Sequence, residues 1–257
     1  MLILLTNDDG IYAPGLAAME RELERLGDVY VVSPATEQSG VGHSITYLSP
    51  LVVKELFVAS QRRGWAVEGS PADCVKIGIF EFCPRLPDLI VSGINAGLNA
   101  GINVLYSGTV AAAIEGAFFG ITSLAVSLEF DEQARFDKAA KLARGVIEQI
   151  LGHGLPAGQL YNLNIPTAAL DSPQRELRIV PMGISRGKEQ YEKRIDPRGR
   201  SYFWALSDPA IHEGEHETDV SALRKGYVTL TPLDFDLTRR SRLAEMERWT
   251  FEMSELD

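Results

Sequence analysis

The sequence predicts an α/β protein built around a doubly wound, mostly parallel β-sheet. Three observations support this prediction: short apolar runs alternate with amphipathic segments of helical length, several of these runs end directly in turn residues, and the chain is 257 residues long. A parallel strand is covered by helices on both faces, so its sequence is apolar throughout. A chain of this length can bury such a sheet between two helical layers.

The first elements form a β-α-β unit. Residues 2–5 are a short apolar run followed by turn residues, which is typical of a buried parallel strand. Pro14 suits a first helical position, apolar side chains follow at helical spacing as far as Leu26, and Gly27 favours a C-terminal stop. Residues 29–32 are the second predicted strand.

The same alternation continues along the chain. Further strands are predicted at residues 88–91, 124–128, 161–165, 177–180 and 226–233. Helices are predicted at residues 110–119, 136–150 and 238–249. Strands that alternate with helices in this way are usually parallel.

The composition changes near residue 185, where charged residues become frequent and apolar residues too few for a separate core. Four aromatic residues lie among these charges: Tyr191, Tyr202, Phe203 and Trp204. We therefore expect residues 1–185 to form the core that holds the site, and residues 186–257 to form an arm with a hairpin and a final helix. Exposed aromatic residues often mark interfaces, and arm exchange between identical chains is a low-cost route to a dimer. An arm that folds back on its own core is the alternative.

Charge and composition exclude several classes of protein. The chain has 35 acidic and 25 basic residues, a formal net charge of −10, whereas a general nucleic-acid binder needs a basic face. A local basic patch around residues 186–200 stays open. The N-terminus lacks the features of a signal peptide, and no stretch is long enough to span a membrane. The two cysteines, Cys74 and Cys83, lack the spacing of a zinc site. So few cysteines in a chain of this length suggest a reducing compartment, so we expect a cytoplasmic protein.

Asp8 and Asp9 follow the first predicted strand. Ligands of open parallel sheets bind at the carboxyl ends of the strands, near the point where the strand order reverses. Two adjacent carboxylates repel each other unless a cation or hydrogen-bond donors compensate, and Mg²⁺ or Mn²⁺ prefers oxygen ligands of this kind. The alternative is a turn with a helix cap, because an aspartate near a helix N-terminus satisfies free N–H groups.

The loop after the second strand, residues 37–44, is polar and contains glycines. Ser39 offers a hydroxyl as a weak metal ligand or phosphate donor, and His43 is a candidate general acid or base. A plain surface loop is the alternative for this segment.

Residues 92–101 form a third candidate loop, with glycines at every fourth position from 93 to 101. These glycines let the backbone approach a ligand closely, and Asn95 and Asn99 offer amide oxygens and N–H donors. The spacing matches neither the dinucleotide fingerprint nor the P-loop. We favour a ligand-binding function over a simple linker.

Two predicted helices begin with polar residues. Ser107, Gly108 and Thr109 open the helix at 110–119, and their hydroxyls and free backbone N–H groups suit an anion, although a plain N-cap uses the same residues. Ser70 and Asp73 fit a capping box, which favours a structural role for that segment.

These motifs together resemble the SurE family, the survival-protein nucleotidases. The resemblance rests on segments that occur in the order typical of the family: residues 6–11, 42–46, 70–75, 91–95, 106–110, 226–228 and 231–233. It extends from residue 1 to about residue 238. Each segment alone is unspecific, but the combination is specific.

The resemblance implies a Rossmann-like core and a metal-dependent phosphatase of nucleoside monophosphates, acting on 5′ and often 3′ phosphates. It implies one divalent cation per subunit, bound by Asp8, Asp9, Ser39 and Asn95. It also implies a homodimer or tetramer assembled through an exchanged C-terminal arm.

The chain departs from the family pattern at three positions. Ala96 stands where many members have a basic residue, Asn103 where many have an acidic one, and Thr229 replaces a common serine. We expect the change at Ala96 to affect substrate preference or phosphate affinity. None of the four implied ligand positions departs.

The sequence therefore predicts a phosphatase in which Asp8 and Asp9 act through a metal-activated water. The phosphate would be held by four residues: Asn95, Ser107, Gly108 and Thr109. One alternative makes Asp8 a covalent nucleophile. Another makes the protein a non-catalytic regulator that binds nucleotides, although two carboxylates beside a phosphate dianion make little sense without a metal.

Overall fold

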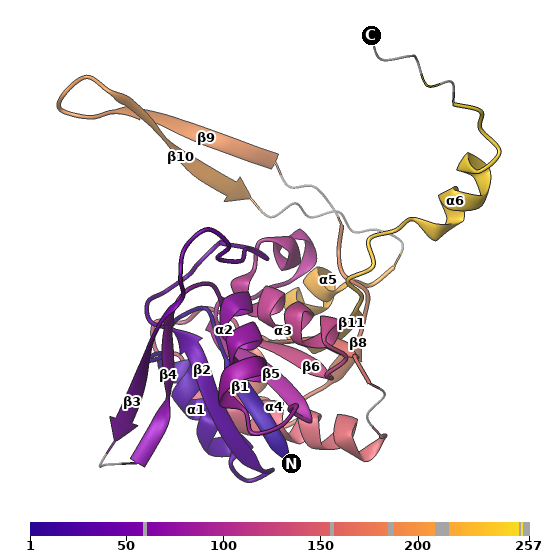
Figure 1. Cartoon of the computed structure of the whole chain (residues 1–257). Coiled ribbons are helices and arrows are strands. Elements are labelled where there is room, and N and C mark those ends of the chain that lie inside the picture. Colours follow the sequence, from indigo (N-terminus) through magenta and orange to yellow (C-terminus); the bar gives the residue numbers. More distant parts are fainter. Residues whose placement is uncertain (59–60, 155–156, 185–187, 209–215, 252, 254–257) are drawn as a thin grey trace.

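The computed structural model describes residues 1–58, 61–154, 157–184, 188–208, 216–251 and 253. Its described residues contain a nine-stranded sheet with helices on both faces, and a separate two-stranded hairpin that projects from it (Figure 1). The sheet strands are β1 Leu2–Thr6, β2 Asp28–Pro34, β3 Val52–Val58, β4 Gln61–Glu68, β5 Leu89–Ala96, β6 Ser123–Leu128, β7 Leu160–Ile165, β8 Leu177–Ile179 and β11 Val228–Leu233.

The strand order is β3-β4-β2-β1-β5-β6-β7-β11-β8. The strands from β4 to β7 are parallel, β3 and β11 are antiparallel to their neighbours β4 and β7, and β8 runs parallel to β11. From β1 the chain first moves outward to β2 and β4, then returns to β5 on the other side of β1. The order therefore reverses between β1 and β5, and the predicted Rossmann-like, mostly parallel sheet is confirmed.

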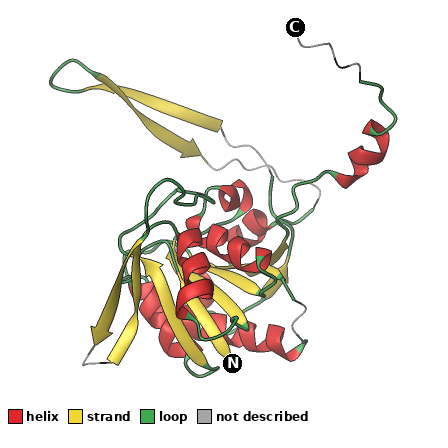
Figure 2. Cartoon of the chain, in the orientation of Figure 1, coloured by secondary structure: helices red, strands yellow, loops and turns green. Residues whose placement is uncertain are grey.

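Helices cover both faces of this sheet (Figure 2). They are α1 Pro14–Leu23, α2 Pro71–Ile77, α3 Gly108–Phe118, α4 Phe136–Gly152, α5 Asp219–Arg224 and α6 Arg240–Met246, with short helical turns at Gly78–Phe82, Gly101–Leu105 and Thr167–Leu170. Helices α1 and α4 pack together in one hydrophobic cluster, and α2 and α3 contact each other and contribute to a second. The buried apolar strands lie between these two layers. None of the described helices has the length and apolar character needed to cross a membrane.

Helix α1 ends earlier than the sequence predicts. It stops at Leu23, and the N–H of Leu26 donates to the Leu23 carbonyl in a turn that follows the helix. Gly27 is not in the left-handed conformation expected of a helix stop. A Cβ atom there would lie 2.0 Å from the Met1 carbonyl oxygen, so the glycine is needed for close packing against the start of β1.

Two elements are absent from the sequence prediction. The first is the β3–β4 pair, which extends the sheet beyond β2. Its buried residue Trp65 stacks between Tyr30 and Phe82, with ring centroids 6.1 and 4.5 Å away. The second is α5, which lies between the predicted arm and β11.

The predicted hairpin is present as β9 Lys188–Ile195 and β10 Ser201–Asp208, which pair antiparallel. Its aromatic residues are exposed: Tyr191, Tyr202, Phe203 and Trp204. The predicted domain boundary at residues 185 and 186 lies outside the described residues. Both the division into core and arm and the use of the arm in assembly stay predictions.

Candidate metal and phosphate site

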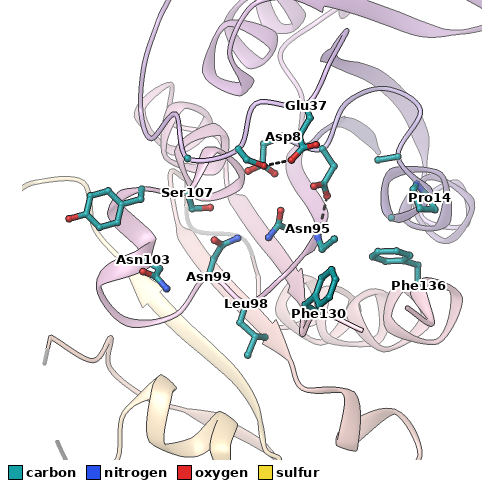
Figure 3. Close-up of a pocket in the computed structure, with 17 residues that line it drawn as sticks. Asp8, Pro14, Glu37, Asn95, Leu98, Asn99, Asn103, Ser107, Phe130 and Phe136 are labelled. Atoms are coloured by element: carbon teal, nitrogen blue, oxygen red, sulfur yellow. Dashed lines mark hydrogen bonds between the residues drawn. The ribbon is translucent and has the colours of Figure 1, made fainter. Parts of the chain in front are cut away.

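A pocket of about 580 Å³ opens at the carboxyl ends of β1 and β5, where the strand order reverses (Figure 3). Five of the predicted site residues line it: Asp8, Asp9, Ser39, Asn95 and Ser107. Four segments that lie far apart in the sequence thus meet at one point. The remaining two predicted residues, Gly108 and Thr109, are not among the residues that line the pocket.

Asp8 is buried and connects the end of β1 to the start of α3. Its Oδ2 accepts a hydrogen bond from the Thr109 N–H at 3.0 Å, and its Oδ1 accepts one from the Thr109 hydroxyl. A Cβ atom on Gly108 would lie 2.9 Å from the Cβ of Asp8, so only glycine allows this close approach. Burial raises the pKa of the Asp8 carboxyl, and the two hydrogen bonds from Thr109 oppose that increase.

These contacts give Thr109 a role that the sequence did not predict. Its hydroxyl and its N–H both donate to Asp8, and the residue is fully buried, so it is not placed to contact an anion in the pocket. Ser107 is the N-cap of α3, and its hydroxyl oxygen accepts a hydrogen bond from the Val110 N–H at 3.1 Å. Ser107 nevertheless lines the pocket. Thr109 positions a carboxylate, whereas Ser107 faces the space that a ligand would fill.

Asp9 lies beside Asp8 and contacts the end of β5. The Ala96 N–H donates to its Oδ2 at 3.2 Å. Burial and then the charge of Asp8 raise the pKa of Asp9 to about 6. The pKa values of both neighbouring carboxyl groups are raised, and a bound cation would stabilise their charged forms.

The loop after β2 brings two more oxygen-bearing side chains to the pocket. The Gln38 N–H donates to the Asp8 carbonyl at 2.8 Å, which holds this loop against the end of β1. The Ser39 hydroxyl donates to Glu37 Oε1 at 2.6 Å, and both residues line the pocket. Glu37 is a third carboxylate that the sequence prediction missed. Glu37 follows β2, the strand next to β1 in the sheet, and this position in the sequence could have identified it as a site residue.

Asn95 lies at the end of β5, near the centre of the pocket in Figure 3. Its Nδ2 donates to the Gly97 carbonyl at 2.7 Å, so the amide oxygen is the atom that it offers to a ligand.

Asn99 lines the pocket and also anchors the same loop. Its N–H donates to Asn164 Oδ1 at 2.8 Å, and its Nδ2 donates to the Ser127 hydroxyl at 2.9 Å. Its carbonyl accepts from the amide of Asn162 at 2.7 Å. These bonds fix the loop after β5 to β6 and β7.

His43 does not line the pocket, so its candidate role as a general acid or base is not supported. Its Nε2 lies 2.6 Å from Glu115 Oε2 on α3, and Lys76 Nζ lies 3.8 Å from the other oxygen of the same carboxylate.

The predicted capping box at the start of α2 is confirmed: the Ser70 hydroxyl accepts from the Asp73 N–H, and the Asp73 carboxylate accepts from the Ser70 N–H.

A cation in this pocket needs a mixed set of ligands. Among the described residues, no group of three or more His, Cys, Asp or Glu side chains is arranged to hold a metal ion. The pocket instead combines the paired carboxylates of Asp8 and Asp9 with the hydroxyl of Ser39 and the amide of Asn95. Carboxylate, hydroxyl and amide oxygens suit the hard cations Mg²⁺ and Mn²⁺, so this set of donors fits the implied metal.

The fold and the pocket define an α/β protein of the doubly wound class with an acidic pocket at its switch point. A family model described as "Survival protein SurE" matches residues 3–189, and the chain belongs to this family. The resemblance drawn from the sequence motifs is therefore confirmed.

Curated relatives align over nearly the whole chain. A protein of Rhodopirellula baltica named "5'-nucleotidase SurE" is 59% identical, covering 97% of this chain and 98% of the relative. A protein of Pelobacter propionicus with the same name is 44% identical, covering 98% of this chain and 100% of the relative. The crystal structure of the SurE protein from Aquifex aeolicus is similar at a TM-score of 0.83 and 36% identity, covering 96% of this chain and 98% of that one.

Proposed function

We propose that the protein hydrolyses nucleoside monophosphates with the help of one divalent cation, Mg²⁺ or Mn²⁺, bound by Asp8, Asp9, Ser39 and Asn95. By family the chain is an enzyme, a 5′-nucleotidase, because relatives of that name match its full length at up to 59% identity. The observation that best supports the metal is the pair of adjacent carboxylates, one buried and one half-buried, at the switch point of the sheet.

A bound cation supplies Lewis-acid chemistry at the phosphoryl group and favours deprotonation of a nearby water. Hydrogen bonds within the chain hold the two carboxylates in place. Thr109 holds Asp8 through two hydrogen bonds, and the Ala96 N–H holds Asp9. Both carboxylates are therefore oriented before any ligand arrives, and this reduces the entropy lost on binding.

The phosphate would lie between Asn95 and the start of α3. A helix N-terminus presents free backbone N–H groups and a partial positive charge to an anion. The Ser107 hydroxyl lines the pocket at this end, and the Gly108 N–H is the first of the helix. Thr109 contributes indirectly, through the placement of Asp8.

The nucleoside would lie on the apolar side of the pocket. Leu98, Phe130 and Phe136 line this side, and in Figure 3 both rings lie across Asn95 from Ser107. Phe136 also packs against the hydrophobic core, whereas Phe130 is 71% exposed. An exposed aromatic ring beside a phosphate site suits stacking with a nucleobase.

Replacing Phe130 with alanine is expected to raise KM for nucleoside monophosphates about fivefold or more, because base stacking is worth roughly 1–3 kcal/mol. KM for ribose 5-phosphate, which has no base, should stay nearly unchanged. Steady-state phosphate release measures both constants. Phe57→Ala is the matched control, since Phe57 is 59% exposed and does not line the pocket. Equal losses for the nucleotide and the sugar phosphate would contradict this placement of the base.

Phosphate release from 5′- and 3′-nucleoside monophosphates, with Mg²⁺ or Mn²⁺ and with a chelator, tests the proposed function. We expect release that the chelator abolishes and either metal restores. No release from any nucleotide would favour the non-catalytic regulator. Labelled phosphate trapped on Asp8 in a rapid quench would favour the covalent alternative over a metal-activated water.

We also infer that the hairpin β9–β10 joins two copies of the chain. It exposes aromatic residues on a two-stranded ribbon, and ribbons of two strands need packing partners to be stable. Light scattering at micromolar concentration should show a dimer or larger assembly. Replacing residues 188–208 with a short Gly-Ser linker should shift it toward monomer. A full-length protein that is already monomeric would refute the exchange.

A further inference from the structure

Asp219 is a fully buried carboxylate outside the pocket. Its Oδ2 accepts a hydrogen bond from the Gly101 N–H at 2.8 Å. Its Oδ1 accepts from the Gly183 N–H at 2.8 Å and from the Val220 N–H at 2.7 Å. One side chain thus joins three segments: the loop after β5, the chain before the hairpin, and α5.

The loop after β5, which Asp219 holds through Gly101, borders the pocket. Gly101 begins the helical turn Gly101–Leu105, and Asn103, Tyr106 and Ser107 of the same stretch line the pocket. Gly101 has a φ of +59°, and a Cβ atom there would lie 2.9 Å from Val220 Cγ2. The loop therefore packs tightly against α5 as well as bonding to Asp219.

Other contacts hold the two ends of this loop. Asn99 is fixed to β6 and β7, and the Tyr106 carbonyl accepts from the Gly42 N–H at 3.0 Å. Between these ends, Asp219 bonds the loop to the C-terminal part of the chain. The two carboxylate oxygens let Asp219 bond the Gly101 and Gly183 N–H groups at once.

The helix itself does not need Asp219 as its cap. Thr218 already caps α5, since its hydroxyl accepts from the Ser221 N–H and the Ser221 hydroxyl accepts from the Thr218 N–H. A buried carboxylate is costly unless its hydrogen bonds compensate. The hydrogen bond from Asp219 to the loop beside the pocket explains why a carboxylate is buried at this position.

Gly183 precedes the β9–β10 hairpin and Asp219 follows it, so the two ends of the hairpin segment meet at this carboxylate. We propose that Asp219 is a positioning residue that fixes the loop of Asn103, Tyr106 and Ser107 to the segments before and after the hairpin, and that this fixed position sets the rate of turnover. The proposal rests on the proposed function, because it concerns the same pocket.

Asp219→Asn tests this role. The asparagine oxygen can still accept from Gly183 and Val220, but its NH₂ group would then face the Gly101 N–H. We expect kcat for a nucleoside monophosphate to fall about tenfold, because small displacements of site residues have effects of this size or larger. The affinity for Mn²⁺, measured by titration calorimetry, should not change, since Asp8 and Asp9 are held by Thr109 and Ala96. Amide hydrogen exchange at residues 99–106 should increase.

Thr218→Ala is the matched control, because it removes the cap of the same helix and leaves the bond to Gly101 in place. It should lower the thermal midpoint without lowering kcat. If Thr218→Ala reduces kcat as much as Asp219→Asn, or if Asp219→Asn keeps full kcat, the positioning role is overturned. If Asp219→Asn does not fold, Gly101→Ala disturbs the same contact from the loop side. If the wild-type enzyme releases no phosphate, the proposed function fails, and the exchange data alone still decide whether Asp219 holds the loop.

Discussion

Asp8→Asn or Asp9→Asn is expected to lower kcat for nucleotide hydrolysis by about 10²-fold or more while the protein stays folded. Both carboxylates border the pocket, and each is held in place by a backbone N–H. Asparagine has nearly the same shape but lacks the negative charge that a divalent cation requires. Initial rates at saturating nucleotide and metal measure kcat, and circular dichroism shows whether the variant stays folded.

Asp171→Asn is the control for the loss of one negative charge. Asp171 forms ion pairs with Arg135 and Lys138 on the surface and does not line the pocket. Exposed ion pairs contribute little, so both activity and stability should stay close to those of the wild type. Full activity in either purified Asp8→Asn or Asp9→Asn would overturn the metal site.

Gly15→Ala is expected to destabilise the protein by about 3 kcal/mol. Gly15 is in the first turn of α1, and a Cβ atom there would lie 2.1 Å from the Ile94 carbonyl oxygen and 3.1 Å from Phe136 Cε1. The helix would have to move away from β5, beside the pocket, because a backbone oxygen cannot rotate aside. Urea denaturation followed by circular dichroism gives the free energy of unfolding.

Gly145→Ala makes the same chemical change in the interior of α4, where a Cβ atom would meet nothing within 4 Å. This variant should be more stable than the wild type by about 0.5–1 kcal/mol, because alanine has the higher helix propensity. Changes of the same sign in Gly15→Ala and Gly145→Ala would show that close packing at α1 is not the reason for the glycine.

Local sequence was sufficient for the parallel core and for most of the loops that meet at the pocket. Residues 2–5 are apolar throughout, and residues 124–128 are apolar except for Ser127, because helices cover both faces of these strands. This pattern is visible without a structure. The β3–β4 pair was missed because it lies toward the edge of the sheet. Residues 54 and 55 are charged and exposed there, and this interrupts the apolar run on which the prediction depended.

Roles that depend on a distant partner were not predictable. The helix start at Ser107 and Thr109 has the composition of an anion site, but the sequence does not show that the Thr109 donors bond to Asp8. His43 has the right chemistry for proton transfer, and only the fold reveals that it bonds to Glu115. The three bonds of Asp219 link positions up to 118 residues apart, beyond the reach of any local pattern.

The stacking of Trp65 between Tyr30 and Phe82 has a spectroscopic consequence. The chain has three tryptophans, of which Trp65 is 4% exposed in the core, Trp204 is 58% exposed in the hairpin, and Trp249 is 46% exposed after α6. In a single chain, iodide should therefore quench the fluorescence of Trp204 and Trp249 and spare that of Trp65, and assembly through the hairpin should reduce the quenching of Trp204. The shielded emission would follow unfolding of the sheet, while the quenchable emission would follow the surroundings of the C-terminal segments, without any added dye.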